Sequence, residues 1–119
     1  MENKPKLKNL KKNSDFLELR RKGIRLNPSE WLQIQYLKAK EGDLFVGMTT
    51  SRKIGSAVIR NRLKRWSREF FRKSLQEEPL QGKLNVVFKP RTSDFYKELK
   101  HDELDGILER AWKRLRTLS

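Results

Sequence analysis

The sequence predicts a small α+β protein, a single-domain sandwich in which helices pack against one sheet. Three observations predict this class. The 119 residues suit one hydrophobic core, because single domains usually contain roughly 100 to 200 residues. Helical and strand patterns follow one another in the order helix, two strands, helix, strand, helix. No internal repeat or linker divides the chain, so these elements should share one core.

The first half of the chain predicts a helix followed by a hairpin. Ser14 is a typical N-cap, and the pattern after it predicts a helix over 14–22. Alternating residues predict a strand over 31–37, and β-branched and apolar residues predict its partner over 44–51. One face of the first strand would carry Leu32, Ile34 and Tyr36.

The second half predicts a long helix, a strand and a final helix. Ser56 is a plausible N-cap for a helix over 57–75. Its predicted apolar stripe consists of Ile59, Leu63, Trp66 and Phe70. The opposite side would be basic, with Asn61 among Arg60, Lys64, Arg65, Arg68 and Arg72. A strand over 84–88 and a helical stretch from about residue 94 onward complete the order.

The charge of the chain indicates a polyanionic partner. There are 29 Lys and Arg against 15 Asp and Glu, a net charge of +14. Residues 1–25 carry nine basic and three acidic side chains, a net +6, and residues 52–73 carry nine and one, a net +8. These two segments account for the whole excess, so the partner should meet them.

Composition argues against several other classes. The chain has no cysteine and one histidine, His101, so a protein-held metal site is not expected. No run of about 20 apolar residues occurs. We therefore expect a cytoplasmic protein without a membrane partner, with a basic flexible arm over 1–13 and a single folded domain over 14–119.

One segment is specific. Residues 51–69 read SRKIGSAVIRNRLKRWSRE, with Arg-Asn-Arg at 60–62, Lys-Arg at 64–65 and Arg-Glu at 68–69. This segment closely resembles the signature of the bacterial ribonuclease P protein family. The segment LKKNSDF at 10–16, followed by Gly23, is similar to the opening helix of that family.

The resemblance implies a fold, a function and partners. The implied order is α-β-β-(β)-α-β-α with a left-handed crossover. The chain would be the protein subunit of ribonuclease P, which removes the 5′ leader of precursor tRNA. Its partners would be ribonuclease P RNA and precursor tRNA, with no obligate protein partner. The RNA would carry the chemistry with Mg²⁺, so the protein alone would bind no cofactor and hold no catalytic residue.

The resemblance also implies two sets of site residues. The residues expected to bind the catalytic RNA are Arg52, Lys53, Arg60, Asn61, Arg62, Lys64, Arg65 and Arg68. Those expected to line a cleft for the leader are Phe16, Arg20, Ile34, Tyr36, Thr49 and Ser51. The family often has an aromatic residue at the position of Arg20 and a tyrosine at that of Ile34. For Phe16, packing on the sheet is an equally good interpretation.

Two alternatives fit the net charge equally well. One is a purely structural RNA binder, such as a ribosomal protein or an RNA chaperone, and the other is a nonspecific DNA-binding protein. Neither requires the signature. A merely solvated helix face is disfavoured, because like charges at i, i+4 repel and a solubility face would mix signs.

Overall fold

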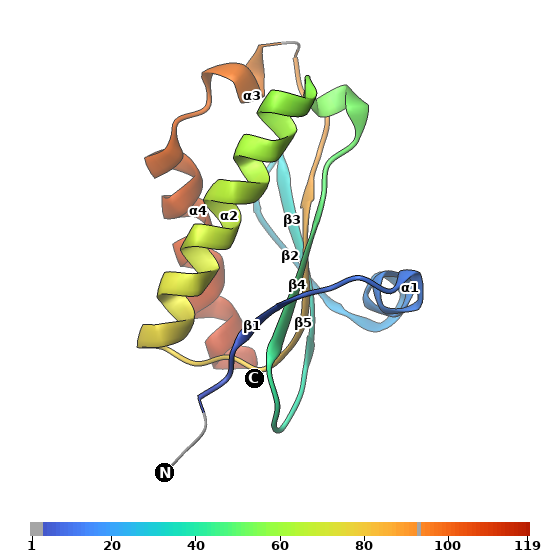
Figure 1. The fold of residues 1–119 in the computed structure, drawn as a ribbon, viewed down its shortest axis with the longest axis vertical. Coiled ribbons are helices and arrows are strands. Elements are labelled where there is room, and N and C mark those ends of the chain that lie inside the picture. Colours follow the sequence, from blue (N-terminus) through green and yellow to red (C-terminus); the bar gives the residue numbers. More distant parts are fainter. Residues whose placement is uncertain (1–3, 93) are drawn as a thin grey trace.

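The computed structural model describes residues 4–92 and 94–119, which form a five-stranded sheet with helices on both of its faces (Figure 1). The strands are β1 (Leu7–Asn9), β2 (Ile24–Ser29), β3 (Leu32–Lys38), β4 (Leu44–Thr49) and β5 (Gly82–Phe88). The helices are α1 (Asn13–Lys22), α2 (Ala57–Glu77), α3 (Phe95–Glu98) and α4 (His101–Leu118), and a 3-10 turn, η1 (Arg52–Ile54), precedes α2. This architecture confirms the predicted α+β class.

The sheet is mixed. Its strand order is β1-β4-β5-β3-β2. β3 runs antiparallel to both of its neighbours, β2 and β5, whereas β4 is parallel to β5 and to β1. Two parallel neighbours need a long crossover connection, and α2 forms the one between β4 and β5. The longest helix is therefore held over the middle of the sheet.

The prediction of a flexible arm over 1–13 is wrong for the residues from Leu7 onward, which are part of the fold. Leu7–Asn9 form the edge strand β1, in which Leu7 pairs with Leu44 of β4. Leu10 is 7% exposed, and its backbone N–H donates to the Val46 carbonyl over 3.0 Å. The folded domain therefore begins before residue 14. Residues 1–3 lie outside the described residues.

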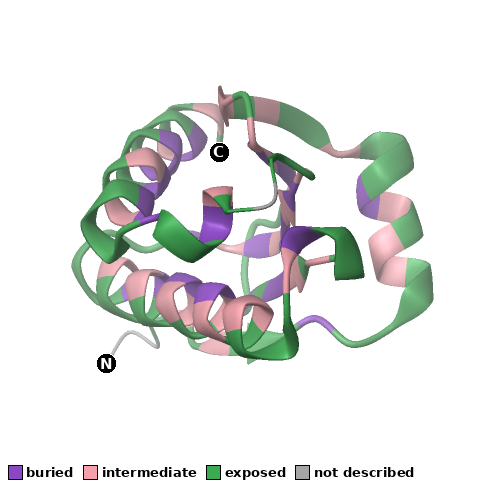
Figure 2. Cartoon of the chain, turned by 90° about the horizontal axis from the view of Figure 1, so that it is seen from above, coloured by how far each residue is buried: buried purple, intermediate pink, exposed green. Residues whose placement is uncertain are grey.

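The main core lies between one face of the sheet and the helices α2 and α4, where buried residues concentrate (Figure 2). Within the described residues, neither helix nor any other is long and apolar enough to cross a membrane. The buried line of α2 differs from the predicted stripe and consists of Leu63, Ser67, Phe71 and Leu75. Ile59, Trp66 and Phe70 are only partly buried. Ser67 fits in the core because its hydroxyl donates to the Leu63 carbonyl over 2.8 Å.

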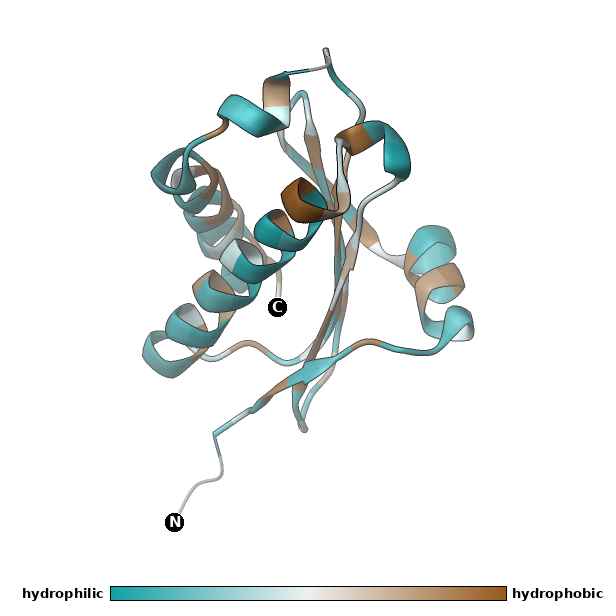
Figure 3. Ribbon diagram, turned by 45° about the horizontal axis from the view of Figure 1, so that its top comes forward, coloured by the Kyte–Doolittle hydropathy of each residue, from teal (hydrophilic) through white to brown (hydrophobic). Residues whose placement is uncertain are grey.

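The other face of the sheet carries α1, which stands on the opposite side from α2 and α4 (Figure 3). Leu19 is the buried residue of α1. The Lys83 ammonium of β5 lies 2.8 Å from the Asp15 carboxylate and 3.3 Å from that of Glu18. The pKa of Lys83 is raised, mainly by the hydrogen bond to Asp15. These contacts fix α1 over one part of the face.

Gly47 of β4 gives α1 room to approach. A Cβ atom at this position would lie 2.6 Å from Cζ of Phe16 and would collide with its ring. We expect Gly47→Val to lower the free energy of unfolding by about 1 to 3 kcal/mol, because the ring must move. The control is Gly106→Ala in α4, where a Cβ atom would meet nothing within 4 Å. That change should stabilise the helix by about 0.5 to 1 kcal/mol. Urea unfolding of both variants measures the difference, and equal stabilities would contradict the tight packing.

Candidate RNA interface

A sharp turn places the signature at the start of α2. Gly55 has φ of +153°, a conformation that side chains disfavour, and it joins η1 to the helix. Ser56 is the N-cap, as predicted, and its hydroxyl accepts from the Ile59 N–H over 3.4 Å. No acidic residue occupies the first turn of α2. The positive end of the helix dipole therefore adds to the charge of Arg52 and Lys53 beside it.

Most of the predicted cations form a continuous basic ridge along η1 and α2. We define the basic ridge as Arg52, Lys53, Arg60, Asn61, Lys64, Arg65 and Arg68. Four of these residues are exposed, and Arg60, Lys64 and Arg68 are half-buried. None of the ridge cations forms an ion pair with an acid in residues 4–92 or 94–119. The ridge is thus an uncompensated positive surface.

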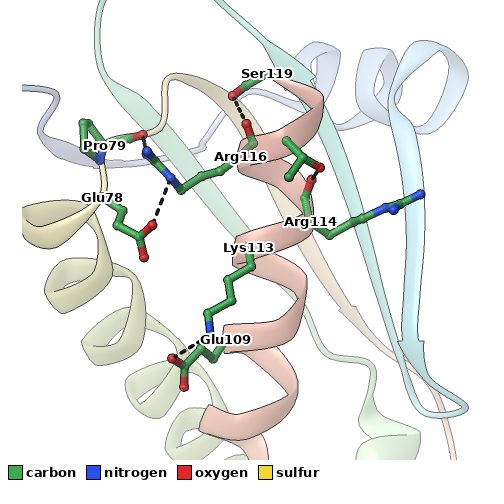
Figure 4. Close-up of polar contacts among 8 residues, drawn as sticks. Glu78, Pro79, Glu109, Lys113, Arg114, Arg116 and Ser119 are labelled. Atoms are coloured by element: carbon green, nitrogen blue, oxygen red, sulfur yellow. Dashed lines mark hydrogen bonds and ion pairs between the residues drawn. The ribbon is translucent and has the colours of Figure 1, made fainter.

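The C-terminal third of the chain differs, because it carries acids as well as cations and several of them pair. Figure 4 shows Arg116 of α4 bound to the Glu78 carboxylate, at 3.3 Å, and to the Pro79 carbonyl. Lys113 and Glu109, one helical turn apart, are 3.8 Å apart. This surface carries charges of both signs that pair with one another, as an ordinary solvated helix face does. The contrast singles out the ridge.

Arg62 does not lie with the ridge, although it belongs to the Arg-Asn-Arg triplet. Its guanidinium donates to the backbone carbonyls of Tyr96, over 2.8 Å, and Lys97, over 3.1 Å. It also stacks 4.9 Å from the centre of the Trp66 ring. These contacts tie α2 to α3. A direct role of Arg62 in RNA binding remains a prediction, and its visible role is structural.

Two of the predicted leader-binding residues are core residues. Ile34 and Tyr36 are 1% and 0% exposed and face α2 and α4. The Tyr36 hydroxyl donates to the Gln81 carbonyl over 2.6 Å, and burial raises its pKa to about 12. Neither side chain is accessible to RNA, so their assignment to the cleft is wrong. The alternating pattern of β3 correctly places Ile34 and Tyr36 on one face, but this face packs in the core and cannot line a cleft.

The opposite face of the same strands is polar and partly covered by α1: Gln35 and Asn85 are only 6% and 5% exposed, whereas Thr49 is exposed. We call this surface the open face and define it by Gln33, Gln35, Thr49, Asn85 and Val87, which are register partners across β3, β5 and β4. Gln35 donates to Gln33 over 3.1 Å, and Thr49 donates to Asn85 over 3.2 Å. Gln33 in turn donates to Asn27 of β2 over 3.3 Å. Side-chain hydrogen bonds therefore join β3 to β2 and β4 to β5 on this face.

The remaining predicted cleft residues lie around this face. Phe16 of α1 is half-buried against Gly47, while Arg20, Thr49 and Ser51 are exposed. Sequence reasoning missed the polar partners on β3 and β5. The signal that could have found them is the alternation itself, because the residues between Leu32, Ile34 and Tyr36 must point away from the core.

A separate cluster of titratable groups lies between α2 and α4. The exposed His101 imidazole stacks on Trp66 at 4.8 Å and lies 3.5 Å from the Asp105 carboxylate and 3.8 Å from that of Glu69. Burial raises the pKa of Asp105. Within the described parts of the chain, no group of three or more His, Cys, Asp or Glu could hold a metal ion.

Comparison with known families identifies the family of this chain. A family model described as Ribonuclease P matches residues 5–116, almost the whole chain. The chain belongs to the ribonuclease P protein family. The role of this family is RNA binding in tRNA processing, as the protein component of an endoribonuclease that works with ribonuclease P RNA.

Individual relatives match this chain over nine tenths or more of their length. The ribonuclease P protein component of Geotalea uraniireducens is 30% identical over 109 residues, which cover 92% of this chain and 95% of the relative. That of Clostridioides difficile is 33% identical over 107 residues, 90% of each chain. The RNase P protein of Thermotoga maritima superposes with a TM-score of 0.77 at 27% identity, covering 90% of this chain and 96% of that one. The RNase P protein of Staphylococcus aureus superposes with a TM-score of 0.71 at 26% identity, covering 90% of this chain and 94% of that one.

Proposed function

We propose that the basic ridge docks on the catalytic RNA of ribonuclease P while the open face binds the 5′ leader of precursor tRNA. The observation that carries the proposal is the uncompensated ridge on α2. Because α2 covers one face of the sheet and the open face is the other, the two surfaces can serve two RNA segments at once. Binding the leader would separate precursor from mature tRNA, and this work would take place in the cytoplasm.

The chemistry of each surface suits its proposed ligand. Arginine forks bind phosphate oxygens bidentately and stack on bases, which suits the surface of a folded RNA. The amide of half-buried Gln33 and the hydroxyl of exposed Thr49 can donate to and accept from a single strand, and buried Gln35 holds the Gln33 side chain in place through its hydrogen bond. Exposed Arg20 at the border of this face can contact a phosphate of that strand. Phe16 offers an aromatic edge where α1 meets the sheet.

We propose that the RNA subunit carries out the cleavage. The ridge consists of cations and one amide, so it provides neither a general base nor a nucleophile. Its residues do not fit Mg²⁺, which takes oxygen ligands and is repelled by cations. Metal ions that cleave the phosphodiester would therefore be held by RNA phosphates. The protein would contribute affinity and positioning.

Reconstitution tests this proposal directly. The protein alone should leave precursor tRNA intact. Added to its cognate catalytic RNA at low Mg²⁺, it should raise the rate of cleavage at the mature 5′ end, because cations of the ridge replace part of the ionic screening that the RNA needs. The measurement is single-turnover cleavage of end-labelled precursor. Cleavage by RNA-free protein at the mature 5′ end would refute the division of labour.

A further inference from the structure

A hollow beside the edge strand β1 is lined by cations that belong to different parts of the chain. Its volume is about 570 Å³. One wall is β1 with the turn before α1, the other is α2, and Phe45 of β4 also lines it. We define the basic hollow by its five cations, Lys8, Lys11, Lys12, Arg68 and Arg72. Folding thus joins cations of both basic segments of the sequence.

The charge of this hollow is not neutralised by the protein. Its one acidic lining residue is Asp15, and that carboxylate already lies 2.8 Å from Lys83. None of the five cations takes part in an ion pair with an acid in the described residues. So many like charges around one concavity repel one another unless an anion lies between them. The hollow therefore favours a ligand with more than one negative charge.

An exposed aromatic residue narrows the class of ligand. Phe45 is 37% exposed, and its register partner across the strands is Lys8, so a ring and an ammonium group lie side by side on one face of the sheet. β1 ends the sheet, which leaves the backbone groups on its outer edge unpaired within it. An aromatic face beside cations is how proteins hold a nucleotide strand, by stacking the base and binding the phosphate.

We propose that the basic hollow binds backbone phosphates and a base of the catalytic RNA, as a second anchor beside the ridge. This inference rests on the proposed function of the ridge. Arg68 belongs to both surfaces, so RNA that covers the ridge reaches the hollow without a gap. A smaller hollow of about 280 Å³ lies beside the segment that leads into β1, lined by Lys4, Lys6 and Arg72 among others. The positive path therefore runs from the ridge around the edge of the sheet.

Charge removal with a matched control tests the anchor. The double variant Lys8→Gln, Arg72→Gln leaves the defined ridge intact, and the control Arg110→Gln, Arg114→Gln removes the same charge from exposed positions of α4. Binding of full-length protein to the cognate catalytic RNA is measured against salt concentration. The hollow variant should bind about tenfold more weakly at 0.15 M salt. The slope of log K against log salt concentration should become shallower by about 1.4 to 1.8, because two charges are removed. The control should change affinity less than about twofold.

Phe45→Leu tests the stacked base separately. Its affinity for the catalytic RNA should fall about fivefold or more with an unchanged salt slope, because a stack releases no counterion. If the Lys8 variant does not fold by circular dichroism, Lys11→Gln, Lys12→Gln replaces it, since both side chains are exposed.

The outcomes separate this inference from the proposed function. Wild-type protein that does not bind the catalytic RNA would overturn both. Wild-type binding with a hollow variant indistinguishable from the α4 control would overturn the anchor and leave the ridge in place. A loss seen only in the affinity of saturated holoenzyme for precursor tRNA would overturn the assignment to the catalytic RNA.

Discussion

Replacing Lys64 and Arg65 of the ridge by Gln should weaken binding to the catalytic RNA by roughly 2 to 4 kcal/mol, because each change removes a charge-assisted hydrogen bond to phosphate. At constant salt this corresponds to about 30- to 900-fold in Kd. The slope of log K against log salt should become shallower by about 1.4 to 1.8, since two fewer phosphates are neutralised. Filter binding from about 50 to 300 mM salt provides both quantities.

The same experiment separates docking from general electrostatics. The Arg110→Gln, Arg114→Gln variant carries the same net charge and should keep the wild-type slope, because these two positions lie beside β2 and not beside the ridge. Melting curves should coincide, since Lys64 and Arg65 form no ion pair with an acid in the described residues. Equal effects in both double variants would mean that RNA responds to the net charge and not to this helix.

The ridge could be predicted because it depends on local rules. A helix turns 100° per residue, so the spacing of the basic residues alone places them along one side of α2. Ser56 and Gly55 mark the start of the helix in the sequence as they do in the structure. Arg62 could not be placed in this way. Its carbonyl partners are 34 and 35 residues away, and no local pattern encodes such a contact.

The edge strands were missed for a physical reason. β1 has only three residues, and β2 contains Asn27 and Pro28. An edge strand pairs along one side and tolerates proline, so it need not show the apolar alternation that identifies a central strand. The predicted strands β3, β4 and β5 occupy the middle of the sheet, where burial imposes that pattern.

The error at the cleft shows how alternation and resemblance can conflict. Alternation correctly grouped Leu32, Ile34 and Tyr36, and their apolar character requires that this group be buried. The resemblance implied a ligand surface on the same strand, and the prediction placed that surface on the face that carries the apolar group. A strand has two faces, and our proposal places the ligand surface on the polar one. Hydrophobicity therefore decides which face of β3 is buried, and the motif position does not.

Replacing Gln33 by Glu should weaken the affinity of the holoenzyme for leader-bearing precursor tRNA by at least about tenfold, because a carboxylate on the open face would repel the leader phosphates at close range. Mature tRNA has no leader and should bind as before. The matched variant is Tyr36→Phe on the opposite face of the same strand. It loses the hydrogen bond to Gln81 and should cost about 1 kcal/mol of stability, with no change in either affinity.

Both affinities are measured with protein saturating the catalytic RNA, so that defects in assembly do not enter. Gln33 is half-buried near the edge of the open face, and glutamate preserves its shape, so the fold should persist. Equal losses for precursor and mature tRNA would place the leader elsewhere. A selective loss for precursor in Tyr36→Phe would return the leader to the buried face of β3, which would have to open to admit it. The expected pattern, selective loss for Gln33→Glu alone, would assign leader recognition to the polar side of the sheet.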